Sequence, residues 1–473
     1  MSNGVRTKFY ADVMAFHPEV TGSLNLIVVK FPDGNTVKFS VGCGLFQERK
    51  YSEMNKVLPF DAKTLDFVLV THNHIDHTGR LPFLIKNGYN RDIYISETTK
   101  PFIGLALKDS FKVLRHTAKR DNEKVLYSED DVERTIEKII GCDYNTTFKV
   151  HPNINVTFLS NGHLVGASMI LVQISYPDCE NINLLFTGDY NNKNMFFDVL
   201  PVPDWVKELP LTIIQESTYG NMDSDSIEYC YKENVINAIN EKKTVITPVF
   251  SLGRAQEILY ELKTLQQEGK LSKDIPIFFD GKLAIKYTNI YLKEDLGIKE
   301  KMKDFLPENL QYVDKVSRPT ILHNNDAKIV LTTSGMGTYG PAQVYIPEYI
   351  SRSNALIHFT GYTAEGSLGA KLKNAEKGSI VDVAGLVVVK QADVEYTTEY
   401  SAHAKADEML KFLSQFSNIR FILVNHGETE VKEEFAKRIR QNIKAKNVGI
   451  LNKEYFFRID PYGFVKPLPT KFK

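Results

Sequence analysis

The sequence has little of three features that would narrow its class: cysteine, net charge and long apolar runs. Its cysteines, Cys43, Cys142, Cys179 and Cys230, lie far apart with no Cys-x-x-Cys spacing. This pattern argues against a disulfide framework and against a thiolate zinc site, and it predicts free, largely buried thiols. Lysine plus arginine equals aspartate plus glutamate at 58 each, so net charge neither demands nor excludes a polyanionic partner. No apolar run approaches the roughly 20 residues that span a bilayer.

The amino-terminal residues have no apolar core of the kind found in signal peptides, and we therefore expect the protein in the cytoplasm. Hydrophobic residues make up 43% and charged residues 25%, which is typical of a globular protein. At 473 residues the chain is too long for one ordinary core. A rule of about 150 residues per domain predicts two or three domains.

Potential metal ligands gather after one apolar run, where His72, His74, Asp76 and His77 fall within six residues. Residues 67–70 predict a buried strand and residues 78–87 have helical character, which places the ligands at the strand's carboxyl end. In an extended turn the first two side chains point the same way, while the other two swing round at the helix start. One metal can therefore take the first pair and a neighbouring metal the second. Imidazole and carboxylate without thiolate is the donor set of catalytic zinc.

The alternative to this metal site is a polar helix cap that carries three histidines by chance. The chain has only 11 histidines, so three within six residues disfavour that alternative. Histidines outside any cluster, at positions 17, 116, 151, 323 and 358, are interpreted as structural.

Around the histidine cluster the pattern alternates strand and helix. Residues 24–45 predict a hairpin that turns at Asp33-Gly34, residues 93–96 a strand and residues 99–117 a helix. A capping-box pattern at Ser128 predicts another helix that closes near Gly141.

Three later strands, at 155–159, 182–186 and 211–215, end at His163, Asp189 and Glu216. One such residue after a strand would mean little, but strands that pair in one sheet with the first would bring these side chains to one rim. Asp189 is the best candidate to bridge two metals, because a carboxylate has two oxygens. If a strand at 421–424 joins the first sheet, His426 completes the second metal's set. His403 is then the histidine of the group that is not assigned to a metal.

Residues 221–395 differ from the preceding residues in sequence pattern and contain strand-helix units of their own. Strands at 244–249, 276–279, 329–331 and 355–359 lead into turns, several of them rich in Gly, Ser or Arg, and Ser251-Leu-Gly-Arg254 opens a helix. Such turns present backbone N–H groups to anions, so several around one cleft would make a phosphate track. Each turn alone is a weak signal. No flexible linker marks a boundary, which predicts an inserted domain.

Together these motifs resemble the metallo-β-lactamase superfamily, and within it the β-CASP nucleases, which include RNase J and the endonuclease subunit of the pre-mRNA 3′-end cleavage complex. The resemblance implies an α/β fold in which an αββα metallo-β-lactamase sandwich, residues 1–220 and 396–473, holds an inserted α/β β-CASP domain, residues 221–395. It spans nearly the whole chain and rests on His72-x-His74-x-Asp76-His77, Gly162-His163, Gly188-Asp189, Glu216-Ser-Thr-Tyr-Gly, Pro248 to Glu257, Ser334-Gly-Met, Gly361-Tyr-x-Ala-Glu-Gly366-Ser-Leu, Ser401-Ala-His403-Ala and His426-Gly-Glu.

Carried over by position, the family pattern implies two Zn²⁺ per chain. One would bind His72, His74 and His163 and the other Asp76, His77 and His426, with Asp189 bridging. The predicted catalytic residues are Asp76, His403 and Glu216. The predicted substrate-binding residues are Arg254, Ser334, Gly335, Gly361, Gly366 and Ser401.

Family members that act on RNA resemble this chain in having histidine at the position of His426, so RNA is the expected partner. We expect no membrane association, and a homodimer is a further expectation. Two segments depart from the family: Gly42-Cys43-Gly44 stands where relatives have Asp-Cys-Gly, and residues 19–23 alter a Gly-rich signature. These changes put in doubt the support that the nearby loops give to the site, but not the ligand set.

The resemblance therefore predicts a zinc-dependent ribonuclease that leaves a 5′-phosphate and a 3′-hydroxyl, in RNA processing or decay. His403 would protonate the leaving oxygen, with Glu216 as its orienting partner. The alternative is a hydrolase of DNA or of a small-molecule ester or phosphodiester, because one fold serves many substrates. The inserted domain weighs against a small substrate. A non-catalytic RNA-binding scaffold would require lost ligands, and none is missing. Internal and terminal cutting both stay open.

Overall fold

The computed structural model describes residues 9–227, 229–361, 363, 366–383, 385–445 and 447–470. Tyr362, Ala364 and Glu365 of the predicted Gly361–Gly366 motif lie outside the described residues, as do residues 1–8. The chain forms two compact units: unit 1 comprises residues 1–194, 199–224 and 402–473, and unit 2 comprises residues 195–198 and 225–401. Within the described part, no helix has the length and apolar character needed to cross a membrane.

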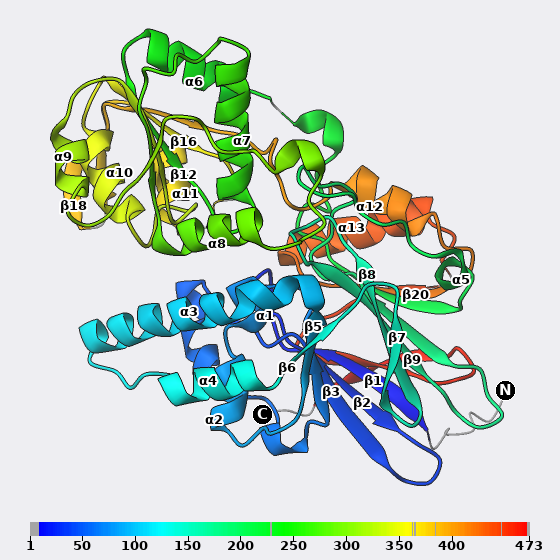
Figure 1. The fold of residues 1–473 in the computed structure, drawn as a ribbon. Coiled ribbons are helices and arrows are strands. Elements are labelled where there is room, and N and C mark those ends of the chain that lie inside the picture. The colour runs from blue at the N-terminus through cyan, green and yellow to red at the C-terminus, as the bar shows by residue number, and fades with distance from the viewer. Residues whose placement is uncertain are drawn as a thin grey trace. The chain divides into compact units, whose positions relative to one another are not determined.

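Unit 1 contains two large sheets (Figure 1). The eight-stranded sheet has the order β23 (Val465–Pro469), β22 (Tyr455–Ile459), β1 (Tyr10–Ala15), β2 (Asn25–Lys30), β3 (Thr36–Val41), β4 (Phe67–Leu69), β5 (Ile93–Ser96) and β6 (Ile139–Cys142). The seven-stranded sheet has the order β21 (Asn447–Ile450), β20 (Ile419–Val424), β11 (Leu211–Gln215), β10 (Ile182–Phe186), β9 (Ser168–Ile174), β8 (Ile154–Ser160) and β7 (Thr147–His151). The helices are α1 (Ile75–Thr78), α2 (Leu81–Lys86), α3 (Lys100–Asp121), α4 (Glu129–Glu137), α5 (Asp204–Lys207), α12 (Ala406–Leu413) and α13 (Thr429–Asn442).

The two sheets pack face to face, because inward-pointing residues of both, among them Phe39 and Ile170, form one buried core. A second core joins the outer face of the first sheet to helices, with Ile103 of α3 packed in it. A third joins the other sheet to α12 and α13 through residues such as Met409 and Phe435. Each sheet thus has helices on one face and the other sheet on the opposite face. The predicted αββα sandwich is confirmed.

Several predicted elements are confirmed, and two need correction. β2 and β3 pair antiparallel around a turn with Gly34 in the left-handed region, as the hairpin pattern predicted. The helix that begins after Ser128 has the predicted capping box but ends at Glu137. Residues Ile139–Cys142 instead form β6, which pairs with β5, so the predicted end near Gly141 was wrong. The segment at 78–87 is not one continuous helix: it contains the last residue of α1, Thr78, and all of α2, with Gly79 and Arg80 between them.

The prediction that the ligand-bearing strands share one sheet was wrong. β4 belongs to the eight-stranded sheet, whereas β8, β10, β11 and β20 belong to the seven-stranded one. The apolar pattern of a buried strand is the same in either sheet. The pattern indicates that the strand is buried, but it does not indicate which strands pair with it. The ligands meet where the carboxyl ends of strands from both sheets converge.

Unit 2 holds a parallel six-stranded sheet of order β14 (Leu310–Tyr312), β13 (Ile277–Asp280), β15 (Lys328–Thr332), β12 (Thr244–Pro248), β16 (Ala355–Phe359) and β19 (Asp393–Tyr396). Its helices are α6 (Tyr231–Asn240), α7 (Arg254–Gln267), α8 (Lys282–Lys293), α9 (Arg318–His323), α10 (Ala342–Ile350) and α11 (Leu368–Asn374). A hairpin of β17 (Ile380–Val383) and β18 (Leu386–Val389) completes it. Because unit 2 begins and ends within unit 1, it is an insertion, as predicted.

Candidate metal centre and its histidine-glutamate pair

The structure gathers the predicted ligands of unit 1 into two groups. His72, His74, His163 and Asp189 form group 1, and Asp76, His77, Asp189 and His426 form group 2. Within each group the ligand atoms all lie within 4.8 Å of one another. These are the two sets that the family pattern implied, and Asp189 is common to both.

Group 1 is built where the turn after β4 meets the ends of β8 and β10. His163 Nε2 lies 3.1 Å from His74 Nδ1 and 3.6 Å from Asp189 Oδ2. His72 Nε2 lies 3.5 Å from the same carboxylate oxygen. His72, His163 and Asp189 are buried, so the group lies away from solvent.

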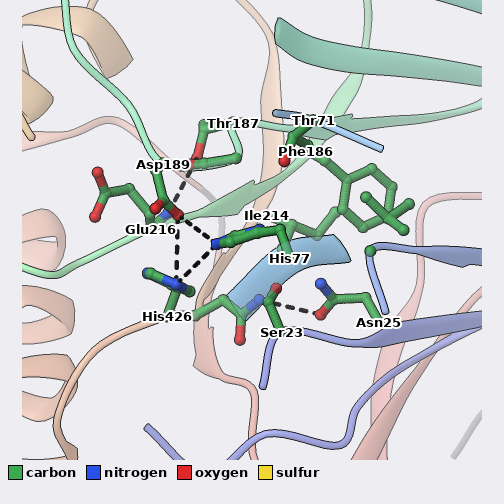
Figure 2. A pocket seen from close by; sticks show the side chains of 14 residues that line it. Ser23, Asn25, Thr71, His77, Phe186, Thr187, Asp189, Ile214, Glu216 and His426 are labelled. Carbon is green, nitrogen blue, oxygen red and sulfur yellow. Dashed lines mark hydrogen bonds and ion pairs between the residues drawn. The ribbon is translucent and has the colours of Figure 1, made fainter. Parts of the chain in front are cut away.

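Group 2 uses the other oxygen of the shared carboxylate. His77 Nε2 lies 3.1 Å from Asp189 Oδ1, 3.2 Å from His426 Nε2 and 3.6 Å from Asp76 Oδ2. His426 Nε2 lies 3.3 Å from the same Asp189 oxygen. Figure 2 shows His77, Asp189 and His426 directed toward one another, with Glu216 beside Asp189. Each carboxylate oxygen of Asp189 therefore faces a different group.

These distances fit a metal ion in each group. Four ligand atoms placed tetrahedrally at about 2.0–2.1 Å from a zinc ion lie about 3.3 Å from one another. The distances of 3.1 to 3.6 Å between neighbouring ligand atoms match that spacing. His72 Nε2 is moreover buried with no hydrogen-bond partner among the described residues, which is costly unless a metal uses it. The nitrogen and oxygen donors present therefore suit zinc.

Burial favours the neutral form of most of the ligand imidazoles, and the neutral form is the one that binds metal. It lowers the pKa of His72 and His163 well below the usual range, and that of His74 and His426 to about 4. Burial alone would raise the pKa of Asp189, but the surrounding histidines hold it well below its usual range. Neutral imidazole and ionised carboxylate need no deprotonation before a cation binds.

Further polar groups orient the ligands from behind, and the sequence analysis missed all of them. Thr71 Oγ1 lies 3.1 Å from His72 Nδ1, and Thr218 Oγ1 lies 3.3 Å from His426 Nδ1. The backbone carbonyl of Ala402 lies 2.9 Å from His163 Nδ1. Such contacts fix which ring nitrogen faces the metal. Thr71 and Thr218 were detectable only as neighbours of assigned residues.

Backbone hydrogen bonds tie the ligand-bearing helix α1 to the two segments that depart from the family pattern. The carbonyl of Asp76 accepts from Ser23 N at 2.8 Å, and that of His77 accepts from Cys43 N at 2.8 Å. Both altered segments therefore still support the ligands, through main-chain groups that do not depend on side-chain identity. The approach is so close that a Cβ built on Gly44 would lie 1.4 Å from the Asp76 carbonyl oxygen.

We expect Gly44→Ala to displace α1, lowering the free energy of unfolding by about 2–4 kcal/mol and reducing the bound zinc. Denaturant melts and metal analysis measure the two effects. Gly104→Ala is the matched control, since its Cβ would meet only the flexible end of Ile136 at 3.3 Å. Wild-type stability and zinc content in Gly44→Ala would show that α1 does not depend on this contact.

His403 lies beside group 1 and is oriented by Glu216. Its Nδ1 is 3.0 Å from Glu216 Oε1, and its Nε2 is 3.9 Å from Asp189 Oδ2. Glu216 is itself fixed, because it accepts backbone N–H bonds from Tyr190 at 2.7 Å and Thr218 at 2.9 Å. The imidazole thus turns one nitrogen to the carboxylate and the other to the ligand groups.

The charges around His403 favour its protonated form. Burial would lower the pKa of this imidazole, but the carboxylate of Glu216, with help from Asp189, raises the pKa to about 9. A protonated imidazole held against a buried carboxylate can deliver a proton from Nε2. Cations in the two groups would oppose this rise by like-charge repulsion.

In unit 2 the predicted substrate-binding residues only partly converge. Arg254, Ser334, Gly335 and Gly361 follow the adjacent parallel strands β12, β15 and β16. A Cβ on Gly361 would lie 3.1 Å from Arg254 Nη1, which is buried without a hydrogen-bond partner among the described residues. Arg254 Nε also pairs with Glu257 at 2.9 Å. Gly366 has open space around it, and Ser401 follows β19, the strand at the edge of the sheet.

Comparison with known proteins adds three family matches in chain order. Residues 41–155 match the metallo-beta-lactamase superfamily, residues 255–372 the Beta-Casp domain, and residues 387–450 the Zn-dependent metallo-hydrolase RNA specificity domain. The Beta-Casp match falls inside unit 2, and the metallo-beta-lactamase match falls inside unit 1. The chain belongs to the β-CASP family of the metallo-β-lactamase superfamily.

Similar β-CASP relatives come from archaea and bacteria. The chain is 28% identical over 410 residues to the RNase J-like protein of Methanocaldococcus jannaschii, covering 85% of this chain and 90% of that protein. It is 28% identical over 428 residues to Ribonuclease TTHA0252 of Thermus thermophilus, covering 87% and 91%. It is 26% identical over 419 residues to Transcription termination factor FttA of Methanosarcina mazei, covering 84% of this chain but only 63% of that protein.

Proposed function

We propose that this β-CASP protein is a zinc-dependent ribonuclease that hydrolyses RNA phosphodiester bonds to leave a 5′-phosphate and a 3′-hydroxyl. The observation that carries the proposal is the pair of ligand groups joined by Asp189, with the His403–Glu216 pair beside them. Two relatives named as an RNase J-like protein and a ribonuclease support RNA as the substrate.

In the proposed mechanism, the metal ions and the side chains of the protein have different roles. When bound, two zinc ions supply Lewis acidity and a nucleophile from water at neutral pH. The chain must then provide the leaving 3′-oxygen with a proton, because an alkoxide is a poor leaving group. His403 is suited to this step, since Nε2 faces the ligand groups while Glu216 holds Nδ1 at 3.0 Å. Glu216 stabilises the imidazolium and fixes its orientation.

A small-molecule or DNA hydrolase remains the alternative, because the fold does not set the substrate. The inserted unit 2 favours a long substrate, since a small ester needs no second domain. One experiment separates the alternatives: a 5′-labelled RNA, the same sequence as DNA, and a generic phosphodiester are incubated with the zinc-loaded protein. Cleavage of RNA alone, with 5′-phosphate products, supports the proposal. Cleavage of the generic ester alone contradicts it. The size of the RNA products also separates internal cutting from terminal cutting.

We expect Arg254→Ala to weaken RNA binding about tenfold at low salt, with the loss shrinking as salt rises, because Arg254 Nη1 has no hydrogen-bond partner among the described residues and guanidinium groups pair with phosphate. Filter binding at several salt concentrations measures it. The Arg254–Glu257 ion pair is the competing explanation. Glu257→Gln is the control, because it removes the ion pair and keeps the guanidinium. Unchanged affinity with equal thermal destabilisation in both variants would show that Arg254 is structural.

Four further points belong to this proposal. The metal is zinc with two ions per chain, the protein acts in the cytoplasm in RNA processing or decay, and it forms a homodimer. The domains divide at residues 1–220, 221–395 and 396–473. Metal analysis, subcellular fractionation, light scattering and limited proteolysis test these points in turn.

A further inference from the structure

Lys405 carries a buried charge that the proposed mechanism does not use. The residue is 1% exposed, and its Nζ makes no hydrogen bond among the described residues. The ammonium instead lies 3.5 Å from the ring centroid of Tyr219, in a cation–π contact. The ring quadrupole attracts the ammonium electrostatically in such a contact.

The carboxylate of Glu408 is already engaged by other groups. Glu408 Oε2 accepts the backbone N–H of Lys405 at 2.9 Å, and Glu408 Oε1 pairs with Lys193 at 2.8 Å. Burial lowers the pKa of Lys405 to about 8, partly offset by Glu408 and Glu216, so the side chain is still charged at neutral pH. Burying an ammonium without a hydrogen bond is costly. A leucine or methionine would fill the same space without that cost, so packing alone does not account for a lysine here.

The ring under the ammonium also contacts the proposed proton donor. The centroid of the Tyr219 ring lies 6.0 Å from that of His403, and the two planes cross at 81° in an edge-on arrangement. Tyr219 belongs to the Glu216–Gly220 turn, whose Thr218 N–H holds Glu216. One ring therefore joins the Lys405 ammonium to the histidine and to the turn that carries its carboxylate partner.

We propose that Lys405 is a positioning residue, whose ammonium fixes the Tyr219 ring and through it the orientation of the His403 imidazole. The inference rests on the proposed function only in taking His403 as the proton donor. Lys405 touches neither substrate nor metal in this role. Its effect is to hold His403 Nε2 toward the leaving oxygen.

The first test is kinetic and uses the zinc-loaded, full-length protein. We expect Lys405→Met to lower kcat for RNA about tenfold, with KM and zinc content unchanged, as is typical of residues that orient a functional group. Lys405→Arg should restore most of the loss, because arginine also stacks on an aromatic face. Lys411→Met, at an exposed lysine of α12, the helix that begins directly after Lys405, is the control and should match wild type. Wild-type kcat in Lys405→Met, or a loss confined to KM, would overturn the proposal.

The second test needs no cleavage, so it separates this inference from the ribonuclease proposal. In zinc-free protein, the NMR signal of the His403 ring, assigned by comparison with His403→Gln, should shift in Lys405→Met and in Tyr219→Leu. The double variant should shift it no further than the larger single change, since both act through one contact. Additive shifts, or an unchanged His403 signal in Lys405→Met, would show that no such coupling exists. Wild-type protein that cuts no RNA would defeat only the proposed function.

Discussion

His74→Ala should abolish RNA cleavage, by about 10³-fold or more, while the protein stays folded. His74 Nδ1 lies 3.1 Å from His163 Nε2 within group 1, so its loss removes one donor from a tetrahedral site. The side chain sits in the turn that begins α1 and belongs to none of the three apolar cores, so stability should fall little. Metal analysis should show zinc falling from about two ions per chain toward one.

The matched control for this variant is His116→Ala, at an exposed histidine of α3 that belongs to neither ligand group. It should keep both ions and full activity. Circular dichroism and thermal melts of the two variants distinguish metal loss from unfolding. Full zinc occupancy and normal cleavage in His74→Ala would contradict the assignment of group 1.

His403→Ala should keep both zinc ions and bind RNA normally, yet cut it about 10²–10⁴-fold more slowly. The reason is that His403 contacts the ligand groups without belonging to either, while Glu216 Oε1 holds its Nδ1. His426→Ala provides the contrast, because His426 is a member of group 2 and its loss should lower zinc occupancy. Zinc analysis therefore separates a proton donor from a ligand before any rate is measured.

A substrate with sulfur in place of the bridging 3′-oxygen gives the sharper test of His403. Sulfur needs little protonation to leave, so His403→Ala should recover most of its deficit relative to wild type. Equal deficits on the sulfur and oxygen substrates, in a variant with intact zinc content, would assign His403 to positioning phosphate instead.

The sequence best predicted the features that depend on residues close together in the chain. β10, β11 and β16 match their predicted ranges, because strands buried on both faces appear as continuous apolar runs bounded by turns. The ligand cluster from His72 to His77 was recognisable for the same reason, since four donors stand within one turn and the start of one short helix. Positions of His163, Asp189 and His426 were predicted only as strand ends, and the family resemblance then grouped them.

Tertiary pairing decided what the sequence could not. Residues Ile139–Cys142 fit either the end of a helix or a strand, and hydrogen bonding to β5 decided for the strand. The sheet to which each strand belongs could not be predicted either, because an apolar run does not indicate which strand it pairs with. The residues that orient the ligands and His403 could not be predicted from the sequence either. Tyr219 stands in the Glu216-Ser-Thr-Tyr-Gly motif, but Lys405 is far from it in sequence, so their contact could not be predicted.

The shared carboxylate of Asp189 joins ligands that the ribosome makes at very different times. His72 emerges early, all of unit 2 must be synthesised next, and β20 with His426 follows only after that. All members of group 1 precede residues 225–401 of unit 2 in the chain, whereas group 2 stays incomplete until those residues have been synthesised. A nascent chain that has not yet passed unit 2 therefore holds only one of the two ligand groups.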